Sequence, residues 1–508
     1  MAILQTNSQP EDEIISAKNN MITRVKAQGP WHQKATSLEL KGASALPMPV
    51  KIATPESLIP CFDHIRKNGT FLPLPGEDQK FSLDEEPYHH TPYIEFEKGV
   101  IYRDRRVDLC KMVLGPTNID GLLDSLESNE FIEHFLLGNN IIGPAGCRRI
   151  SKFLQDYPER MDTWYLAGNC IDAVGFGLMA SSWAKSSATN VWLKRNPLGP
   201  DSAQNVAMLI QNSKTLRTLD LDQTQIGDEG VASLFDILCG GDSATPITLR
   251  HLYLNAGGVG PKAAKSINRF LHSPRCQLES LYLSMNPLGD AGVILLTEAL
   301  NRNTTLQRLM LGSVGMTGAG AEILFKSLAG HPNLMALDVG QAYATEDLKA
   351  HFNWIDDTAA DAITDFILAT PNLRLLDLSY SALSFQSLNK IMLRGVLNSN
   401  SLCALARSTI HKTSHLGHDE VKAVLAMKRI KPRIKERLDS NVFGHYPGMD
   451  LNDFHSDEIR WLKGPKEDLR KIDSVYRNRD AGLQRRGLKR LNKWWHSDDQ
   501  TLDVVMNS

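Results

Sequence analysis

Residue types that perform catalysis are present in this chain of 508 residues, but no recognisable catalytic motif contains them. The sequence has neither a G-x-S-x-G nucleophile motif nor a phosphate-binding G-x-x-x-x-G-K-[ST] loop. His411, His415 and His418 have the i, i+4, i+7 spacing of one helix face, and three imidazoles can bind zinc. A nearby glycine and a Ser/Thr-rich context disfavour that helix, and only Asp419 or Glu420 offers a fourth ligand. We therefore expect a solvated linker here, and no catalytic residue, metal or cofactor.

The seven cysteines are scattered, and their number is odd. Without a C-x-x-C pair they predict neither a disulfide framework nor a zinc site, and they favour a reducing compartment. The N-terminus has acidic residues where a secretory signal would need an apolar stretch, and no apolar run approaches the length of a transmembrane helix. We expect a cytoplasmic protein without a transmembrane segment.

A pattern of the form L-x-x-L-x-L-x-x-N-x-I-G recurs about eleven times, and each copy precedes a helical stretch. The clearest copies span 216–227 and 278–289. The Asn position of successive copies is assigned to Thr117, Asn140, Asn169, Asn196, Thr224, Gly257, Asn286, Val314, Ala342, Ser381 and Ile410. A period of roughly 28 residues that contains a strand and then a helix indicates a solenoid of stacked repeats.

Each repeat is expected to contain one short strand and one amphipathic helix. Alternation along 216–221 places Leu219 and Asp220 on opposite faces of the strand. The Asn side chain can bond backbone groups left open after the strand, which Val314 and Ala342 cannot do. Stacked neighbours bury the apolar stripe of each helix, with parallel strands on the concave inner face and helices outside.

The period, the core pattern and the G-D-x-G helix starts at Gly227 and Gly289 resemble those of the ribonuclease-inhibitor subclass of leucine-rich repeat proteins. The resemblance covers roughly residues 105–410. The subclass also includes Ran GTPase-activating proteins and the sensor ends of NOD-like receptors. The resemblance implies an α/β leucine-rich repeat horseshoe whose activity is protein binding.

One side chain of each strand, between its two close-spaced apolar residues, must point to the concave face. These positions are assigned to Val113, Leu136, Tyr165, Trp192, Asp220, Tyr253, Tyr282, Met310, Asp338 and Asp377. Four of five successive repeats carry an aromatic residue there, and two residues further along, polar side chains flank the resulting stripe. The sequence therefore predicts a partner-binding surface made of Tyr165, Trp192, Lys194, Asp220, Asp222, Tyr253, Asn255 and Tyr282. Alternatively, the N-terminal segment covers the rings, or the rings only pack side by side on the inner face of the sheet and bind no partner.

Composition divides the chain into four regions. Residues 1–85 lack the repeat pattern and are rich in proline, so they are expected to be irregular and partly disordered, apart from an amphipathic piece at Leu58–Ile65. Alternation on both sides of Lys98 and Gly99 predicts a hairpin over 86–106 that caps the solenoid. Residues 107–410 form the solenoid, and residues 411–508 form a basic helical region.

The spacing between Ala342 and Ser381 exceeds the usual period by about eleven residues. The surplus, at Ala344–Asp361, is expected to leave one face of the solenoid as a loop or extra turn. Such insertions often serve binding, although this one could also have no role.

Residues 411–508 carry 20 Lys and Arg against 15 Asp and Glu, so this region is net basic. A basic helix over Val421–Leu438 is expected to break near Pro432. Leu483–Trp495 has five cations and no acid, with an apolar face at helical spacing. It could contact an acidic partner or a membrane surface, serve nuclear import, or pack on the end of the solenoid with its cations in water.

These features together predict a non-enzymatic, protein-binding scaffold, with sensor and inhibitor as its candidate roles, whose partner is another protein and not a nucleic acid. The resemblance offers one enzymatic alternative, a GTPase-activating protein of the Ran-activator type, and Arg195 would be the residue to test. Those activators typically carry an acidic tail after the repeats, whereas the corresponding region of this chain is basic.

Overall fold

The computed structural model describes residues 21–44, 51–77, 85–86, 91–240, 245–411, 417–476, 501–506 and 508. These residues divide into two compact units. The first repeat unit contains the described residues of 40–281 and 464–508, and the second repeat unit contains those of 21–39 and 282–463.

The first repeat unit begins with antiparallel strands at the edge of its sheet. β1 (Glu85–Glu86) pairs with β2 (Thr91–Glu95), which pairs with β3 (Val100–Tyr102). β2 and β3 form a hairpin that turns through Gly99, whose φ of +106° suits glycine. β4 (Arg106–Asp108) pairs antiparallel with β3 on one side and parallel with β5 on the other, so it joins the hairpin to the repeats.

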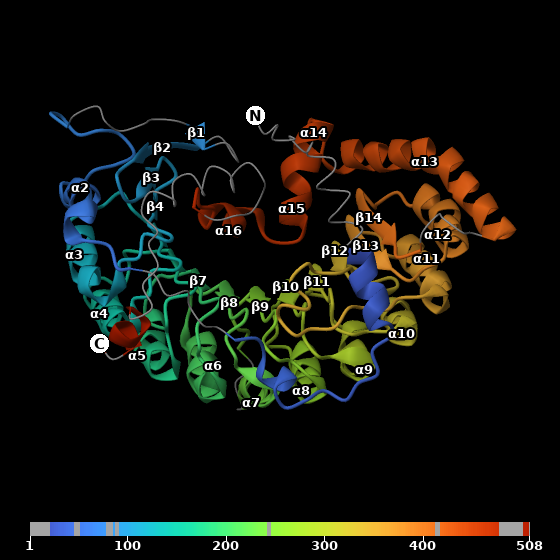
Figure 1. Ribbon diagram of the computed structural model, residues 1–508, viewed down its shortest axis with the longest axis horizontal. Helices are drawn as coiled ribbons and strands as arrows, with labels where there is room; N and C mark the ends of the chain where they lie inside the picture. The colour runs from blue at the N-terminus through green and yellow to red at the C-terminus, as the bar shows by residue number, and fades with distance from the viewer. Residues whose placement is uncertain are drawn as a thin grey trace, which may run out of the picture. The chain divides into compact units, whose positions relative to one another are not determined.

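From β4 onward the strands of this unit are parallel and lie in chain order, and a helix follows each of them. The strands are β5 (His134–Leu136), β6 (Thr163–Tyr165), β7 (Asn190–Trp192), β8 (Thr218–Asp220) and β9 (His251–Tyr253). The helices are α3 (Gly115–Glu127), α4 (Gly143–Asp156), α5 (Ala173–Trp183), α6 (Ala203–Asn212), α7 (Gly227–Cys239) and α8 (Pro261–Leu271). All six helices lie on one side of the strands (Figure 1). We call the opposite side of the sheet the strand face.

The amphipathic piece expected at Leu58–Ile65 lies within a helix, α2 (Pro55–Arg66), which packs against α3. Its buried side includes Leu58 and Ile65, which bound the amphipathic piece. The amide of Asn129 donates hydrogen bonds of 3.0 Å to the carbonyl oxygens of Ile65 and Gly69 and fixes the end of this helix.

The asparagine ladder connects successive repeats of the first unit as the sequence predicts. Asn169 Nδ2 donates to the carbonyl of Leu137 at 2.8 Å, and its backbone N–H donates to Asn196 Oδ1 at 2.8 Å. Asn140 Nδ2 likewise donates to Leu109 O at 2.8 Å. These bonds satisfy buried backbone groups between strand and helix.

One assignment in the first repeat is wrong. β4 pairs with β5 through Val107–Phe135 and Asp108–Leu136, so Asp108, and not Val113, occupies the concave position. The Asn position is therefore Met112, one regular period before Asn140, and not Thr117. The apolar residues near Val113 and Leu114 resemble the repeat pattern, but they lie five positions after the true one.

The second repeat unit continues the same alternation of strand and helix. Its strands are β11 (Arg308–Met310), β12 (Ala336–Asp338), β13 (Leu375–Ser381) and β14 (Ala404–Thr409). Its repeat helices are α9 (Gly289–Leu300), α10 (Gly318–Leu328), α11 (Ala360–Ala369) and α12 (Phe385–Lys390). β11 to β14 are parallel and lie in chain order, and β10 (Ser280–Tyr282) lies at the division between the units. The fold class is the expected leucine-rich repeat solenoid.

Short helical turns occur between these elements, at η1 (Glu39–Lys41), η2 (Pro200–Ser202), η3 (Asp357–Ala359), η4 (Ile391–Gly395), η5 (Val396–Asn398) and η6 (Phe454–Glu458).

The insertion of the second unit supplies a residue that the repeat pattern lacks. Asn353 Nδ2 donates to the carbonyl oxygens of Leu311 and Val339, both at 2.9 Å. Its Oδ1 accepts from the backbone N–H groups of Val314 and Met316, both at 3.0 Å. Asn353 therefore fills the ladder position that was assigned to Ala342. Because Ser381 follows Asn353 by one regular period, the surplus chain lies before Asn353.

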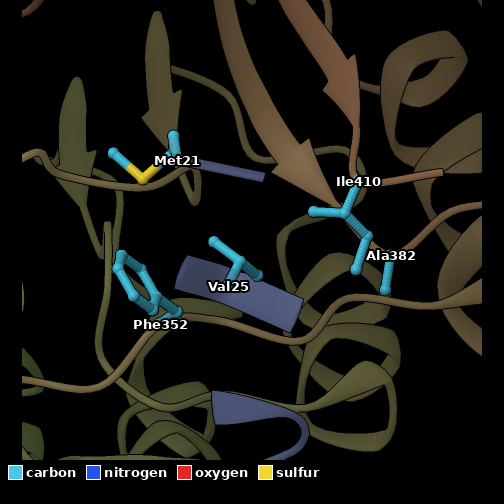
Figure 2. Close-up of a cluster of buried hydrophobic side chains, with 5 residues drawn as sticks. All are labelled: Met21, Val25, Phe352, Ala382 and Ile410. Carbon is cyan, nitrogen blue, oxygen red and sulfur yellow. The ribbon is translucent and has the colours of Figure 1, made fainter. Parts of the chain in front are cut away.

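The N-terminal segment docks against this insertion. Met21 and Val25, at the helical residues 21–28, form a buried cluster with Phe352, Ala382 and Ile410 (Figure 2). The segment thus packs on loops that follow three successive strands.

Polar and aromatic contacts extend this docking. Gln28 exchanges two hydrogen bonds with the backbone of Phe352, at 2.8 and 3.1 Å. The ring of Trp31 stacks on His351 with centroids 4.0 Å apart, and His351 Nε2 lies 3.0 Å from Glu39 Oε1.

The C-terminal region contributes helices to both units. In the second unit, α13 (His418–His445), α14 (Leu451–Asp453) and α15 (Ile459–Leu462) follow the last strand. α13 runs through Pro432, so the expected break does not occur there. In the first unit, α16 (Lys466–Lys471) and α18 (Thr501–Met506) belong to this region. Leu483–Trp495 lies outside the described residues.

Among the described residues, no helix is both long and apolar enough to cross a membrane.

Candidate protein-binding surface

Two rows of side chains run across the strand face of the first unit. Strand pairing places Tyr165 opposite Trp192, Trp192 opposite Asp220 and Asp220 opposite Tyr253. We call this the aromatic row. Two positions earlier on each strand, and therefore on the same face, is a polar row made of Arg106, His134, Thr163, Asn190, Thr218 and His251.

The aromatic row brings together three of the four predicted rings. The centroids of Tyr165 and Trp192 are 6.5 Å apart, and those of Trp192 and Tyr253 are 5.0 Å apart. Trp192 and Tyr253 thus meet across the strand that carries Asp220, as the sequence predicts. Tyr282 belongs to the second unit.

The rings are more enclosed than expected. Tyr165 is 4% exposed, Trp192 is 3% exposed and Tyr253 is 7% exposed, so they do not form an exposed stripe. Asp220 is also buried, and its Oδ1 accepts the backbone N–H of Asp222 at 2.8 Å.

The flanking polar residues form a closed cluster. Asp222 accepts from the backbone N–H of Asn255 at 2.7 Å and from its side-chain amide at 3.1 Å. Lys194 Nζ lies 3.5 Å from the same carboxylate. Burial raises the pKa of Asp222, and Lys194 and Asn255 oppose that shift without reversing it. Lys194 remains partly exposed, with 41% of its side chain accessible.

The polar row holds a segment of the same chain. Asp468 of α16 accepts a hydrogen bond of 2.6 Å from Thr218 Oγ1, and the same carboxylate lies 3.9 Å from His251 Nε2. Three positions later, Lys471 Nζ lies 3.0 Å from Asp162 Oδ2. α16 lies on the strand face of the first unit, away from its helices (Figure 1).

The surroundings of Asp162 favour its negatively charged form. Its carboxylate accepts hydrogen bonds from Thr163 at 2.9 Å and from Thr189, and it lies 3.3 Å from His134 Nδ1. Burial alone would raise the pKa of Asp162, but the bonds from His134 and Thr189 and the charge of Lys471 lower it overall. The side chain therefore carries its negative charge at neutral pH.

Beyond α16, residues 472–476 are buried against β3 and β4. The fully buried Arg106 donates to the carbonyl oxygen of Asp473, and its guanidinium stacks on the ring of Tyr102 at 4.0 Å. The backbone N–H of Val475 donates to Tyr102 Oη at 3.2 Å. A hydrogen bond from Ser474 to Asp108 adds a further anchor. We call residues 466–476 the C-terminal strap.

The polar row and the strap were not predicted from the sequence. A signal for the row was available, because residues two positions before the aromatic row must share its face. In repeat order they are Arg, His, Thr, Asn, Thr and His, which is an unusually polar series for buried strands. The strap itself has no repeat pattern that could have placed it on the face.

The second unit shows a related contact. Asp338 and Asp377, both at expected concave positions, lie 3.0 Å and 2.8 Å from Lys463 Nζ. Burial alone would lower the pKa of Lys463, but the two carboxylates raise it overall. The strand face of each unit thus contacts C-terminal residues of the chain.

The remaining candidates are held by local contacts. His411 pairs with the carbonyl oxygen of Ala382 at 3.0 Å, whereas His415 lies outside the described residues. The guanidinium of Arg195 donates to Asn139 Oδ1 at 3.1 Å. Within the described part of the chain there is no cluster of three or more His, Cys, Asp or Glu residues that could hold a metal ion.

Comparisons with known proteins agree with this architecture. A family model described as "Leucine Rich repeat" matches residues 212–235 and 276–296. Over 270 residues the chain is 27% identical to the pig protein "Ribonuclease inhibitor", which covers 46% of this chain and 57% of that protein. It is 29% identical over 225 residues to the mouse protein "NACHT, LRR and PYD domains-containing protein 12", covering 43% of this chain and 21% of that protein.

A solved structure titled "Crystal structure of Rad7 and Elc1 complex in yeast" matches with a TM-score of 0.32 and 16% identity, over 54% of this chain and 69% of that one. The aligned region spans less than two thirds of the curated relatives' own lengths. The repeat pattern, the ladder geometry and these relatives identify the chain as a leucine-rich repeat protein similar to ribonuclease inhibitor.

Proposed function

We propose that this protein is a non-enzymatic scaffold that binds another protein on the strand face of its first repeat unit. The proposed surface consists of Tyr165, Trp192, Lys194, Asp220, Asp222, Tyr253 and Asn255, all of which belong to the first unit. The observation that carries the proposal is the C-terminal strap. A strand face that already holds a polypeptide through side-chain contacts has the chemistry to hold one from a partner.

The aromatic row favours the same function. Trp192 and Tyr253 are in ring contact, and aromatic residues supply much of the binding energy where they lie at the centre of an interface. The buried indole N–H of Trp192 has no hydrogen-bond acceptor among the residues that the structure describes. An acceptor from a bound chain would satisfy this donor.

We also propose that the protein works inside the cell, in a reducing compartment. Cys61, Cys147, Cys170 and Cys403 are thiols, and burial raises the pKa of each. Protonated, enclosed thiols do not need an oxidising environment for their stability.

The test is affinity capture with the full chain from its native host, followed by binding measurements with the purified partner. We expect Trp192→Ala and Tyr253→Ala to weaken the affinity by roughly 30- to 1,000-fold, the range for buried hot-spot aromatics. Tyr343→Ala is the control, because that ring is 59% exposed in the second unit. Thermal unfolding of each variant separates loss of binding from loss of fold.

Two results would contradict the proposal. One is an affinity that neither Trp192→Ala nor Tyr253→Ala changes. The other is accelerated nucleotide hydrolysis by a small GTPase when the protein is added, which would favour the GTPase-activating alternative.

A further inference from the structure

We propose that the polar row of the first unit is a recognition site for a linear peptide motif, and that the C-terminal strap is its occupant in cis. The motif is an acidic residue, then a basic residue three positions later, and an apolar residue directly after it. The partner of this scaffold would present the same motif. This inference rests on the proposed function and names the class of partner.

The spacing of the charges follows from α16. Asp468 and Lys471 are three positions apart, so one turn of helix presents them on the same side. Asp468 reaches Thr218 and His251, on β8 and β9, while Lys471 reaches Asp162, directly before β6. The two opposite charges of the strap therefore meet sites of matching chemistry on different repeats.

The groups under the strap require polar partners. Thr218 is fully buried and His251 is 8% exposed, and burying such groups without a hydrogen-bond partner is costly. Asp162 keeps its negative charge, which two threonine hydroxyls already stabilise, and its carboxylate attracts a cation in preference to an anion. A chain that replaces the strap must therefore supply a hydrogen-bond acceptor for Thr218. A carboxylate there and an ammonium or guanidinium beside Asp162 match both sites, as Asp468 and Lys471 do in the strap.

Apolar residues complete the motif. Ile472 follows Lys471 directly and is fully buried, as are Val475 and Tyr476. An acidic and a basic residue at the right spacing but without these apolar residues would bury much less surface.

The strap is suited to replacement. Lys471 and Asp162 retain 29% and 26% exposure at their side chains, and ion pairs with such access to water contribute little net stability. The strap also lies outside the repeats, so its release need not disturb their stacked core. A partner that carries the same motif competes with a tethered segment whose effective concentration is in the millimolar range.

The probe is a fluorescently labelled synthetic peptide with the sequence of residues 464–476. Its binding is followed by anisotropy with the full-length wild-type chain and with the full-length variant Asp468→Ala/Lys471→Ala, whose strap is weakened. Glu467→Ala is the control, because Glu467 is an exposed neighbour on the same helix. A second peptide in which the Asp468 and Lys471 residues are exchanged has the same composition and net charge.

We expect the labelled peptide to bind the weakened variant at least about tenfold more tightly than wild type or Glu467→Ala. The charge-exchanged peptide should bind that variant at least about tenfold more weakly than the native peptide. If the double variant does not fold, as judged by thermal unfolding, Asp468→Ala alone gives the same comparison with a smaller difference.

Three results would overturn the inference. Failure of the peptide to bind any folded variant would make the strap a structural cap. Equal binding of the two peptides would show that the order of the two charges does not matter. Equal binding to wild type and to the weakened variant would show that the peptide binds outside the polar row. Partner binding is measured separately with Trp192→Ala and Tyr253→Ala, so a failure of this inference can be distinguished from a failure of the proposed function.

Discussion

At the scale of single residues, the described structure depends on polar side chains that complete buried hydrogen bonds. Asn353 is the clearest example. It belongs to an insertion, yet its side chain makes the ladder hydrogen bonds of a regular repeat. Isolated bridges pair Val314 with His351 and Thr317 with Trp354, so the chain around Asn353 runs parallel to the preceding turn.

We predict that Asn353→Ala lowers the free energy of unfolding by roughly 2–4 kcal/mol, because it leaves several buried backbone groups without partners. The exposed Asn398, whose amide also bonds two backbone carbonyls, provides the control. Its replacement by alanine should cost less than about 1 kcal/mol. Urea unfolding monitored by circular dichroism measures the free energy of unfolding of both variants. Equal losses in the two variants would contradict the role assigned to Asn353.

The lowered pKa of Asp162 predicts a dependence of stability on pH. A carboxyl group whose pKa is lower in the folded state stabilises the fold above its unfolded pKa, about 4. This contribution is lost as the pH falls through the folded pKa. The difference in unfolding free energy between wild type and Asp162→Asn should therefore be largest above about pH 5 and shrink below about pH 4. A difference that stays constant from pH 7 to pH 3 would contradict the assigned shift.

At the scale of elements, the N-terminal segment and the insertion of the second unit support each other. Trp31 packs over two glycines as well as on His351. A Cβ at Gly315 would lie 2.1 Å from the Trp31 ring, and one at Gly289 would lie 3.3 Å from it. The glycines of these turns therefore let the segment approach the repeats closely.

Gly315→Ala should displace Trp31 and destabilise the second unit. Two causes contribute, the clash with the Trp31 ring and the backbone strain of a positive φ, and Gly330→Ala has only the second. Both glycines have positive φ, at +74° and +82°, but nothing lies within 4 Å of a Cβ at Gly330. Gly330→Ala should cost only the backbone strain, about 1–2 kcal/mol. Gly315→Ala should cost more and should also speed amide hydrogen exchange at residues 343–353. Equal exchange there in both variants would show that Trp31 does not hold the insertion.

The sequence predicted the repeated elements well because each strand and helix carries its own local signal. Leu219 and Leu221 alternate as a strand requires, and the helices bury the apolar stripes that their spacing indicates. The assignment of the first repeat failed because Met112 stands where asparagine marks the next three turns, at Asn140, Asn169 and Asn196. The role of Asn353 could not be predicted, because it depends on how the insertion folds back to bond the backbone of Leu311 and Val339.

At the scale of the whole chain, segments outside the repeats determine what the strand faces present. The repeat pattern indicated which residues face away from the helices, and strand pairing and ring contacts bring Tyr165, Trp192 and Tyr253 together in one row. Periodicity does not reveal how the C-terminal residues pair with the strand faces. Lys463 and Lys471 reach carboxylates that precede them by 86 and 309 residues, and no local pattern encodes such pairings.

The central claim is that the strand face of the first unit holds the C-terminal strap through the polar row. The most direct measurement is a double-mutant cycle of unfolding free energies for Asp162→Asn and Lys471→Met. We predict a coupling of about 0.5–1 kcal/mol, the upper part of the range for ion pairs with access to water. The control cycle pairs Asp162→Asn with Lys185→Met, an exposed lysine with no ion pair among the described residues, and its coupling should be near zero. Effects of Asp162→Asn and Lys471→Met that add within about 0.3 kcal/mol would contradict the claim.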